Sequence, residues 1–180
     1  GSYVADAQIV TTERPPAHQN GVNARGIWFR NGFGMLVRDC EVVMEGPAIS
    51  DGAIVVSPHS NAVTIRDTRV QAAIDGMSAL TVKRPIEEGP TNPDIRIENL
   101  HISGNANEGD AVLIIGRNGC EFTKLYLHQT GQSRNGIHLI DSNNTVVQDS
   151  TVNVTGRPFI LDHSNVDLTG VTTRSDIPDS

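Results

Sequence analysis

The sequence is poor in aromatic residues and in lysine, and each shortage narrows the class of protein. Aromatic residues make up 4% of the 180 residues, so we expect Val, Ile, Leu and Ala to fill the core. Only Lys83 and Lys124 are lysines, and the net charge is −7. That balance argues against a nucleic-acid partner. No run approaches the roughly 18 apolar residues of a membrane helix, so we expect no membrane insertion.

Cysteine is also scarce, which bears on metal binding. Cys40 and Cys120 are the only two cysteines, and neither belongs to a CxxC pair or to a histidine cluster. We therefore expect two buried free thiols, no metal site of the zinc type and no cofactor. The length suits one domain over 1–180, and Gly1-Ser2 is typical of a cloning scar.

A repeated six-residue pattern runs through the whole chain. It reads apolar, any, Asp or Asn, any, any, apolar, as in Ile65–Val70 and Val147–Val152. Its polar position, degenerate in two copies, occurs at residues 6, 39, 67, 99, 124, 149 and 170. Repeats of 20 to 50 residues indicate stacked architectures. We expect one internal or turn-lining ladder formed by Asp39, Asp67, Asn99 and Asp149.

A second series of short apolar runs alternates with this pattern. The runs are residues 26–29, 52–55, 78–81, 110–113, 136–139 and 157–160. Gly, Asn and Pro separate them from the six-residue pattern, and no segment sustains helical periodicity. Each repeat therefore contains two or three short strands and cannot bury its own apolar face, so we expect an all-β solenoid of stacked repeats.

The closest single segment to a known family is residues 135–147, which read NGIHLIDSNNTVV. Together with the repeats, it resembles the right-handed parallel β-helix (pectin-lyase-like) superfamily over nearly the whole chain. The resemblance implies a right-handed single-stranded parallel β-helix of six to seven rungs. The first copy, residues 4–9, is half a rung, so we expect that the chain was excised from a longer solenoid or follows another domain.

The first strand of each rung raises a question about its outer face. Aligning the second series predicts one outward column, formed by Trp28, Ile54, Leu80, Val112, His138 and Phe159. Five of these six residues are apolar. Either the alignment is one residue off in some rungs, or a terminal segment or a partner subunit covers the stripe. The second alternative predicts a homo-oligomer, such as a trimer, through Trp28, Ile54, Leu80, Val112 and Phe159.

The polar residues that follow these strands form the best candidate ligand site. They are Lys83, Arg117, Asp141, Asp162 and His163. Stacking Asp141 on Asp162 would place two carboxylates one rung apart, which could bind Ca²⁺ or, with the cations, an acidic sugar. A weaker second set is Asp75, Glu108, Asp110 and Arg134. The long connections at 11–25 and 83–93 are expected to help build a binding face.

The resemblance implies carbohydrate as the partner class, because the superfamily includes pectate lyases, polygalacturonases, epimerases, phage tailspikes and adhesins. The polygalacturonase motifs are incomplete here: Asp110 stands alone where that family has paired aspartates, and no GHG turn occurs. We therefore expect a surface or extracellular module that recognises a glycan or mediates assembly, as spikes and adhesins do. The alternative is a divergent or partial polysaccharide lyase, glycoside hydrolase or epimerase.

Overall fold

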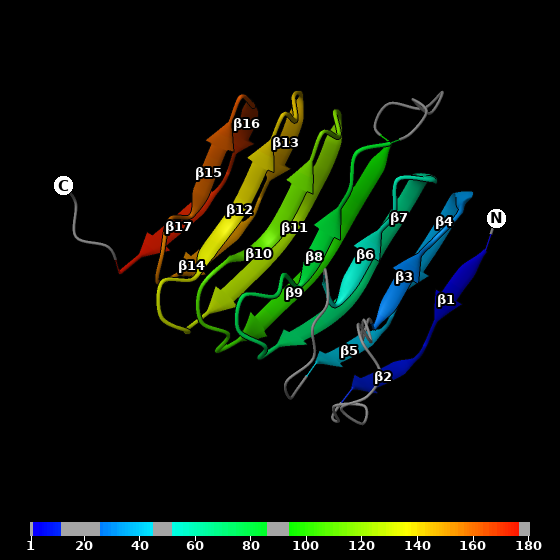
Figure 1. Ribbon diagram of the computed structural model, residues 1–180, viewed down its shortest axis with the longest axis horizontal. Helices are drawn as coiled ribbons and strands as arrows, with labels where there is room; N and C mark the ends of the chain where they lie inside the picture. The colour runs from blue at the N-terminus through cyan, green and yellow to red at the C-terminus, as the bar shows by residue number, and fades with distance from the viewer. Residues whose placement is uncertain (1, 12–25, 45–51, 86–93, 177–180) are drawn as a thin grey trace, which may run out of the picture.

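The protein consists of two parallel β-sheets that face one another (Figure 1). The computed structural model describes residues 2–11, 26–44, 52–85 and 94–176, and no helix occurs in these ranges. The six-stranded sheet contains β3 (Ile27–Phe29), β6 (Ile54–Val56), β8 (Leu80–Val82), β10 (Asp110–Ile115), β12 (Asn135–Ile140) and β15 (Phe159–Asp162). The eleven-stranded sheet contains β1 (Tyr3–Ala5), β2 (Gln8–Thr11), β4 (Gly32–Arg38), β5 (Glu41–Met44), β7 (Ser60–Ala72), β9 (Ile95–Gly104), β11 (Cys120–Gln129), β13 (Thr145–Gln148), β14 (Thr151–Val154), β16 (Val166–Thr169) and β17 (Thr172–Ser175).

The chain passes repeatedly from the smaller sheet to the larger one. For example, β8 in the six-stranded sheet is followed by β9 in the other, and then by β10 back in the first. Every strand pairing is parallel and joins equivalent strands of successive repeats, so the colours in Figure 1 run in order along the stack. The expected all-β architecture with parallel sheets is confirmed, and this arrangement is compatible with a parallel β-helix.

The seven polar positions of the repeat form one column in the eleven-stranded sheet. In each repeat, the residue just before this position pairs with its counterpart in the next repeat, from Ala5 with Arg38 to Gln148 with Thr169. All seven have a positive φ between 47° and 64°: Asp6, Asp39, Asp67, Asn99, Lys124, Asp149 and Gly170. Asn and Asp tolerate this left-handed conformation best. The predicted ladder is therefore confirmed in its turn-lining form, and it bends the sheet into two halves.

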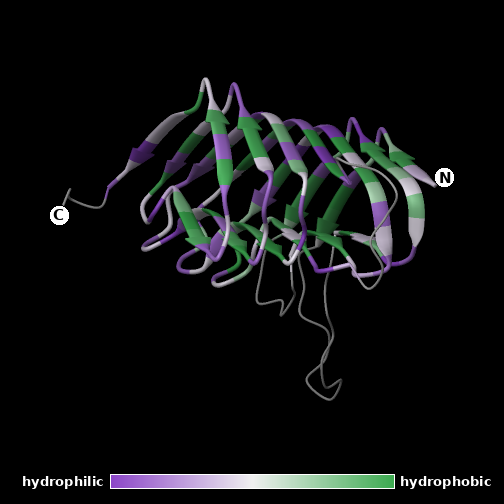
Figure 2. Ribbon diagram, turned by 90° about the horizontal axis from the view of Figure 1, so that it is seen from above, coloured by the Kyte–Doolittle hydropathy of each residue, from purple (hydrophilic) through white to green (hydrophobic). Residues whose placement is uncertain are grey.

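The space between the sheets is filled by aliphatic side chains, as the composition predicts. Val37, Ile65, Ile97, Phe122 and Val147 form one such buried column. In Figure 2, the hydrophobic segments recur on the strands that enclose the interior.

Both cysteines are free and buried in this core, as expected. Burial raises the pKa of Cys120 to about 12, so this thiol is a packing group rather than a nucleophile.

The outward column expected on the six-stranded sheet is wrong. Ile54, Leu80 and Val112 are fully buried in the core, where they pair in register with one another. Trp28 is 44% exposed, and its partner on β6 is Val55 instead of Ile54. The residues in register with Trp28 are Val55, Thr81, Leu113, His138 and Ile160, and two of these, Val55 and Thr81, are themselves buried, at 1% and 2% exposed.

An alanine in three of the repeats explains this error of one residue. Ala53, Ala79 and Ala111 are buried and each stands directly before a core residue. Gly26 and Gly136, by contrast, are followed at once by the core residues Ile27 and Ile137. The sequence alignment placed these glycines level with the residues that precede the alanines. It therefore displaced β3 and β12 by one residue relative to the other strands. Three of the five residues expected to join subunits, Ile54, Leu80 and Val112, are core residues, and oligomerisation itself stays a prediction.

The two longest connections, 11–25 and 83–93, lie mostly outside the described residues. The described ranges contain no helix that is long and apolar enough to span a membrane.

Candidate functional site: a polar groove across the larger sheet

The two carboxylates of the predicted site do not stack. Asp162 pairs in register with Ile140, so the position above Asp141 belongs to His163. The Asp141 carboxylate lies 3.8 Å from His163 Nδ1 and 3.7 Å from Arg84, and all three groups are exposed. Asp162 turns instead toward His138. The predicted stacking of Asp141 on Asp162 is therefore wrong, and binding of Ca²⁺ by these residues stays a prediction.

Arg117 is not part of a surface cluster either. Its side chain is 1% exposed and reaches back across two repeats, where it donates hydrogen bonds to Asp94, to Asn61 Oδ1 at 2.9 Å and to the Ser60 carbonyl at 2.9 Å. Burying such a charge without partners would cost a prohibitive amount of folding free energy. Arg117 is thus a structural cross-link, and Lys83, which follows β8, lies two repeats from Asp141.

The weaker predicted set divides in a similar way. Arg134 is buried and donates to the Met77 carbonyl and, at 2.6 Å, to the Glu108 carbonyl. Burial lowers the pKa of Arg134 to about 10, although the charges of Asp110 and Asp75 act in the opposite direction. The backbone N–H of Asn107 donates to Asp75 at 2.8 Å, which lowers the pKa of that carboxyl. These residues hold turns together.

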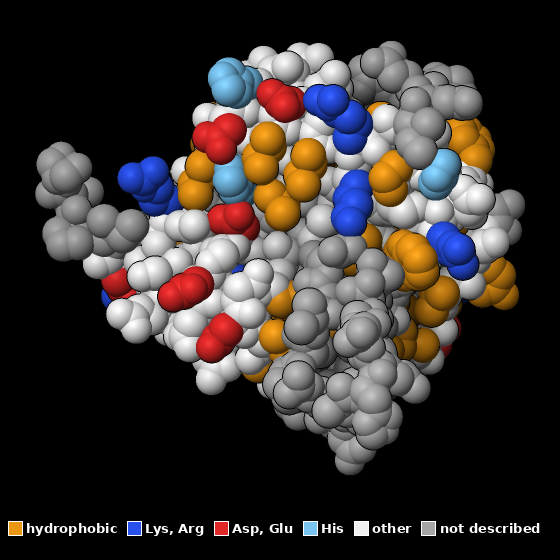
Figure 3. Space-filling view, in the orientation of Figure 1, with side chains coloured by type: hydrophobic (Ala, Val, Ile, Leu, Met, Phe, Trp, Pro, Cys, Tyr) orange, Lys and Arg blue, Asp and Glu red, His pale blue; other side chains and the backbone are white. Residues whose placement is uncertain are grey.

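Asp110, in contrast, joins a chain of three titratable groups on the six-stranded sheet. His138 Nδ1 lies 2.8 Å from Asp110 Oδ2, and His138 Nε2 lies 2.9 Å from Asp162 Oδ2. Asn135 also donates to Asp110, at 3.0 Å. Asp110, His138 and Asp162 lie on β10, β12 and β15, which belong to three successive repeats. Figure 3 shows charged and histidine side chains gathered with hydrophobic ones over the upper left of the face that it presents.

Hydrogen-bond accounting assigns the charge state of His138. A neutral imidazole donates from only one nitrogen, and both of its nitrogens face carboxylates that can only accept. Burial lowers the pKa of His138, but hydrogen bonds and charge from Asp110 and Asp162 outweigh it, so the pKa is raised. The imidazole also fills the space between the two carboxylates. Neither a sugar nor a hydrolytic water fits between them in this arrangement.

A continuous groove crosses the outer face of the eleven-stranded sheet on the C-terminal side of the ladder. Three adjoining hollows make it up: the first shares Arg69 and His101 with the second, and the second shares His128 and Asn153 with the third. We call it the polar groove and define it by Arg69, His101, Tyr126, His128, Asn153 and Arg174. These residues come from β7, β9, β11, β14 and β17, so the groove runs perpendicular to the strands.

The centre of the polar groove is a stacked aromatic pair. The rings of His101 and Tyr126 lie 4.6 Å apart at 29°, because the two residues are register partners on β9 and β11. His101 Nε2 also lies 3.1 Å from Asn99 Oδ1, which links the pair to the ladder. A fixed aromatic surface beside amide and hydroxyl groups suits the flat apolar faces and the hydroxyls of a sugar.

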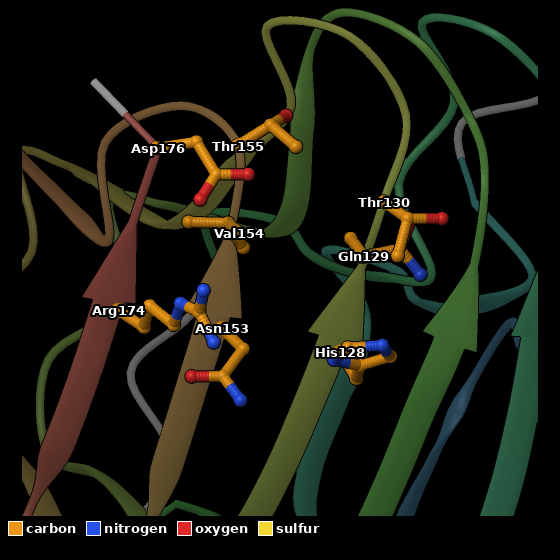
Figure 4. Close-up of a pocket in the computed structure, with 8 residues that line it drawn as sticks. All are labelled: His128, Gln129, Thr130, Asn153, Val154, Thr155, Arg174 and Asp176. Carbon is orange, nitrogen blue, oxygen red and sulfur yellow. The ribbon is translucent and has the colours of Figure 1, made fainter. Parts of the chain in front are cut away.

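The C-terminal end of the polar groove is lined by groups of both charges, Arg174 and Asp176, together with Asn153. In Figure 4, Arg174 extends from β17 across β14 toward Asn153, with His128 on the neighbouring β11. Gln129 lines the same hollow and is 2% exposed, yet neither its amide nitrogen nor its amide oxygen has a hydrogen-bond partner within the described part of the chain. Gln129 alternates with the buried Leu125 and Leu127 along β11, so its side chain lies on the inward face of that strand, opposite His128.

Sequence reasoning passed over this groove, although the signal was present. Two positions beyond each ladder residue stand Arg69, His101, Tyr126 and Thr151, and four positions beyond stand Ser103, His128, Asn153 and Arg174. Both series follow directly from the ladder register. His101 and His128 look unremarkable when each is considered alone, and only this alignment brings them together.

Neither a family model, nor a curated protein, nor a solved structure matches the chain. Within the described ranges, no three His, Cys, Asp or Glu residues are grouped as a metal ion would require. The polar surface of the larger sheet is therefore the best indication of function.

Proposed function

We propose that the chain is a right-handed parallel β-helix, related to the pectin-lyase-like superfamily, that recognises a glycan along the polar groove. The alternation between two parallel sheets and the single ladder support this fold. The observation that carries the function is the stacked pair of His101 and Tyr126 within a groove that crosses five strands. As in spikes and adhesins, such a module would act outside the cell or on a virion.

The geometry of the groove favours an extended ligand over a compact one. Successive strands are about 4.8 Å apart, so each repeat presents one outward residue per step along the groove. Arg69, His101, Tyr126 and Thr151 occupy successive steps in this way. A linear oligosaccharide lying across the strands would meet a new side chain at each step.

The alternative, a polysaccharide lyase, hydrolase or epimerase, has one supporting observation. Asp110, His138 and Asp162 are hydrogen-bonded in series, which is an arrangement that could move a proton. Both ring nitrogens of His138 are already engaged, however, and the polar groove lies on the other sheet. Recognition therefore accounts for more of the surface than catalysis does.

Glycan-array screening followed by calorimetry with the best glycan tests the proposal. We expect Tyr126→Ala to weaken binding about tenfold, because stacking residues at the centre of an interface contribute most of the affinity. Tyr3→Ala is the matched control, since Tyr3 is an exposed tyrosine on β1 outside the groove. Binding to no glycan, or equal loss in both variants, would overturn the proposal.

A further inference from the structure

The last repeat of the described ranges consists of β15, β16 and β17, and little apolar burial holds it in place. Its strands pair with β12, β13 and β14, and no described strand pairs with their other edges. None of the residues in these three strands is buried, whereas each strand of the preceding repeat contains buried residues. Leu161 and Leu168 take inward positions, yet they are 44% and 47% exposed. This repeat is therefore the one that opens most easily.

Two ion pairs cross the junction between this repeat and the preceding one, and both join a histidine to an aspartate. His138 on β12 lies 2.9 Å from Asp162 on β15. His163, directly after β15, lies 3.8 Å from Asp141, directly after β12. No other ion pair between described residues crosses this junction. Histidine is the side chain that changes its charge between about pH 5 and 8, so the charge pairing at this junction depends on pH.

The junction between the repeats of β9 and β11 depends on arginine instead. Arg96 on β9 lies 3.4 Å from Glu121 on β11, and Arg117, just before β11, pairs with Asp94, just before β9. Arginine keeps its charge throughout the pH range in which histidine titrates. The two junctions should therefore respond differently to a change in pH.

His138 can serve both of its neighbours only while its imidazole is charged. Its Nδ1 lies 2.8 Å from Asp110 on β10, and its Nε2 faces Asp162 on β15. Its register partners on these strands, Leu113 and Ile160, carry no charge. A neutral imidazole donates one hydrogen bond, so one of the two carboxylates must lose its donor when the proton leaves.

Asp110 is the carboxylate that should keep the donor. The side-chain amide of Asn135 donates to it at 3.0 Å, and the charge of the buried Arg134 attracts it. The side chain of Asp110 is 17% exposed and that of Asp162 is 55% exposed, so water replaces a lost partner more easily at Asp162. Deprotonation of His138 should therefore break the bond to β15.

From these observations we infer that His138 is a pH-sensitive switch: its charged imidazole holds the last repeat closed, and loss of the proton lets β15, β16 and β17 open while the earlier repeats stay folded. Burial acts to lower the pKa of His138, but hydrogen bonds and charge from Asp110 and Asp162 outweigh it and raise the pKa. The repeat is therefore closed below about pH 6.5 and opens as pH rises through the raised pKa. This inference does not depend on glycan binding.

Methyl NMR of the full chain between about pH 5.5 and 9 tests the inference. We expect the methyl signals of Leu161 and Leu168 to shift toward their unfolded positions, with the same midpoint as the ring signals of His138. The shift should correspond to a rise of about tenfold in the ratio of open to closed molecules. Leu168 lies on the other sheet from His138, so it reports opening rather than the charge of the ring. The buried Leu100 and Leu127 should not move. No shift at Leu168, or an equal shift at Leu100, would overturn the inference.

Variants then assign the effect to His138. His138→Gln cannot take up a proton and should remove the pH dependence at Leu168, and Asp162→Asn, a change at an exposed residue, should do the same if His138→Gln does not fold. His138→Lys keeps a positive charge and should leave the repeat closed across the range. His59→Gln is the matched control, because His59 is exposed in the turn before β7 and lies far from this junction. A pH dependence that persists in His138→Gln, or that disappears in His59→Gln, would overturn the assignment.

Discussion

Four arginines of this protein have opposite roles, and the difference follows from their partners. Arg117 and Arg134 are buried, and each reaches back across two repeats to backbone carbonyls. Arg69 and Arg174 are exposed in the polar groove and have no ion-pair partner in the described ranges. A buried charge is tolerated only when it is paired, so the first two hold the repeats together, whereas the second two are solvated at the surface.

Two histidines repeat this contrast on opposite sheets. His138 is held between two carboxylates from neighbouring repeats. His101 is stacked on Tyr126 and faces the groove. Both point outward from their strands, so strand position alone does not determine their role. What separates them is whether the adjacent repeats supply hydrogen-bond partners.

The largest expected effect is on stability, from breaking the Arg117 cross-link. Arg117→Met leaves the Asp94 carboxylate, which is 10% exposed, without its cation. We expect the free energy of unfolding to fall by about 3–5 kcal/mol, measured by urea denaturation. Arg96→Met should change it by less than about 1 kcal/mol, because that arginine pairs only at the surface.

A second variant keeps this prediction testable if Arg117→Met does not fold. Adding Asp94→Asn removes the uncompensated charge and should restore part of the lost stability. Similar stability of Arg117→Met and Arg96→Met would show that the contrast between buried and exposed arginines is wrong.

The next effect concerns pH, through His138. The pKa of His138 is higher in the folded state than in the unfolded state. Between these two pKa values, folding is therefore accompanied by the uptake of a proton. The stabilisation is complete below about pH 6.5 and is lost as pH rises through the raised pKa. We expect His138→Gln to remove about 1–2 kcal/mol of this pH-dependent stability, measured by urea denaturation between pH 5 and 9.

The two carboxylates should differ in their share of that effect. Asp110 has a side chain that is 17% exposed, whereas the side chain of Asp162 is 55% exposed and screened by water. Asp110→Asn should therefore flatten the pH dependence more than Asp162→Asn does. An equal or reversed order would mean that His138 is not held as the geometry indicates.

The fold could be predicted because the sequence repeats. The site could not, because placing its residues requires an alignment of the repeats that is correct at every residue. The ladder at Asp39, Asp67, Asn99 and Asp149 was predicted correctly, since each position must adopt the same left-handed conformation. The first strands lacked such a marker, and buried alanines shifted their alignment by one residue. That single shift placed Ile54 outside and stacked Asp141 on Asp162.

Long-range pairing of charged groups was a second obstacle to prediction. Arg117 reaches Asp94 and Ser60, which are 23 and 57 residues away, and nothing in the local sequence indicates such a contact. The polar groove, by contrast, depends only on the ladder register. It could have been predicted by extending that register two and four positions along each strand.

The smallest expected effect is at Asn99, where the ladder meets the polar groove. Asn99 has φ of 52°, and its side chain donates to Asp67 Oδ1 at 2.8 Å on the surface. Asn99→Val places a β-branched residue in the left-handed region and should cost about 1–2 kcal/mol of unfolding free energy. Asn99→Gly loses the same exposed hydrogen bond but suits the backbone, so its unfolding free energy should remain within about 0.5 kcal/mol of wild type. If both variants lose stability equally, the side-chain hydrogen bond of Asn99 stabilises the ladder. If only Asn99→Val loses stability, the left-handed backbone conformation is what matters at this position.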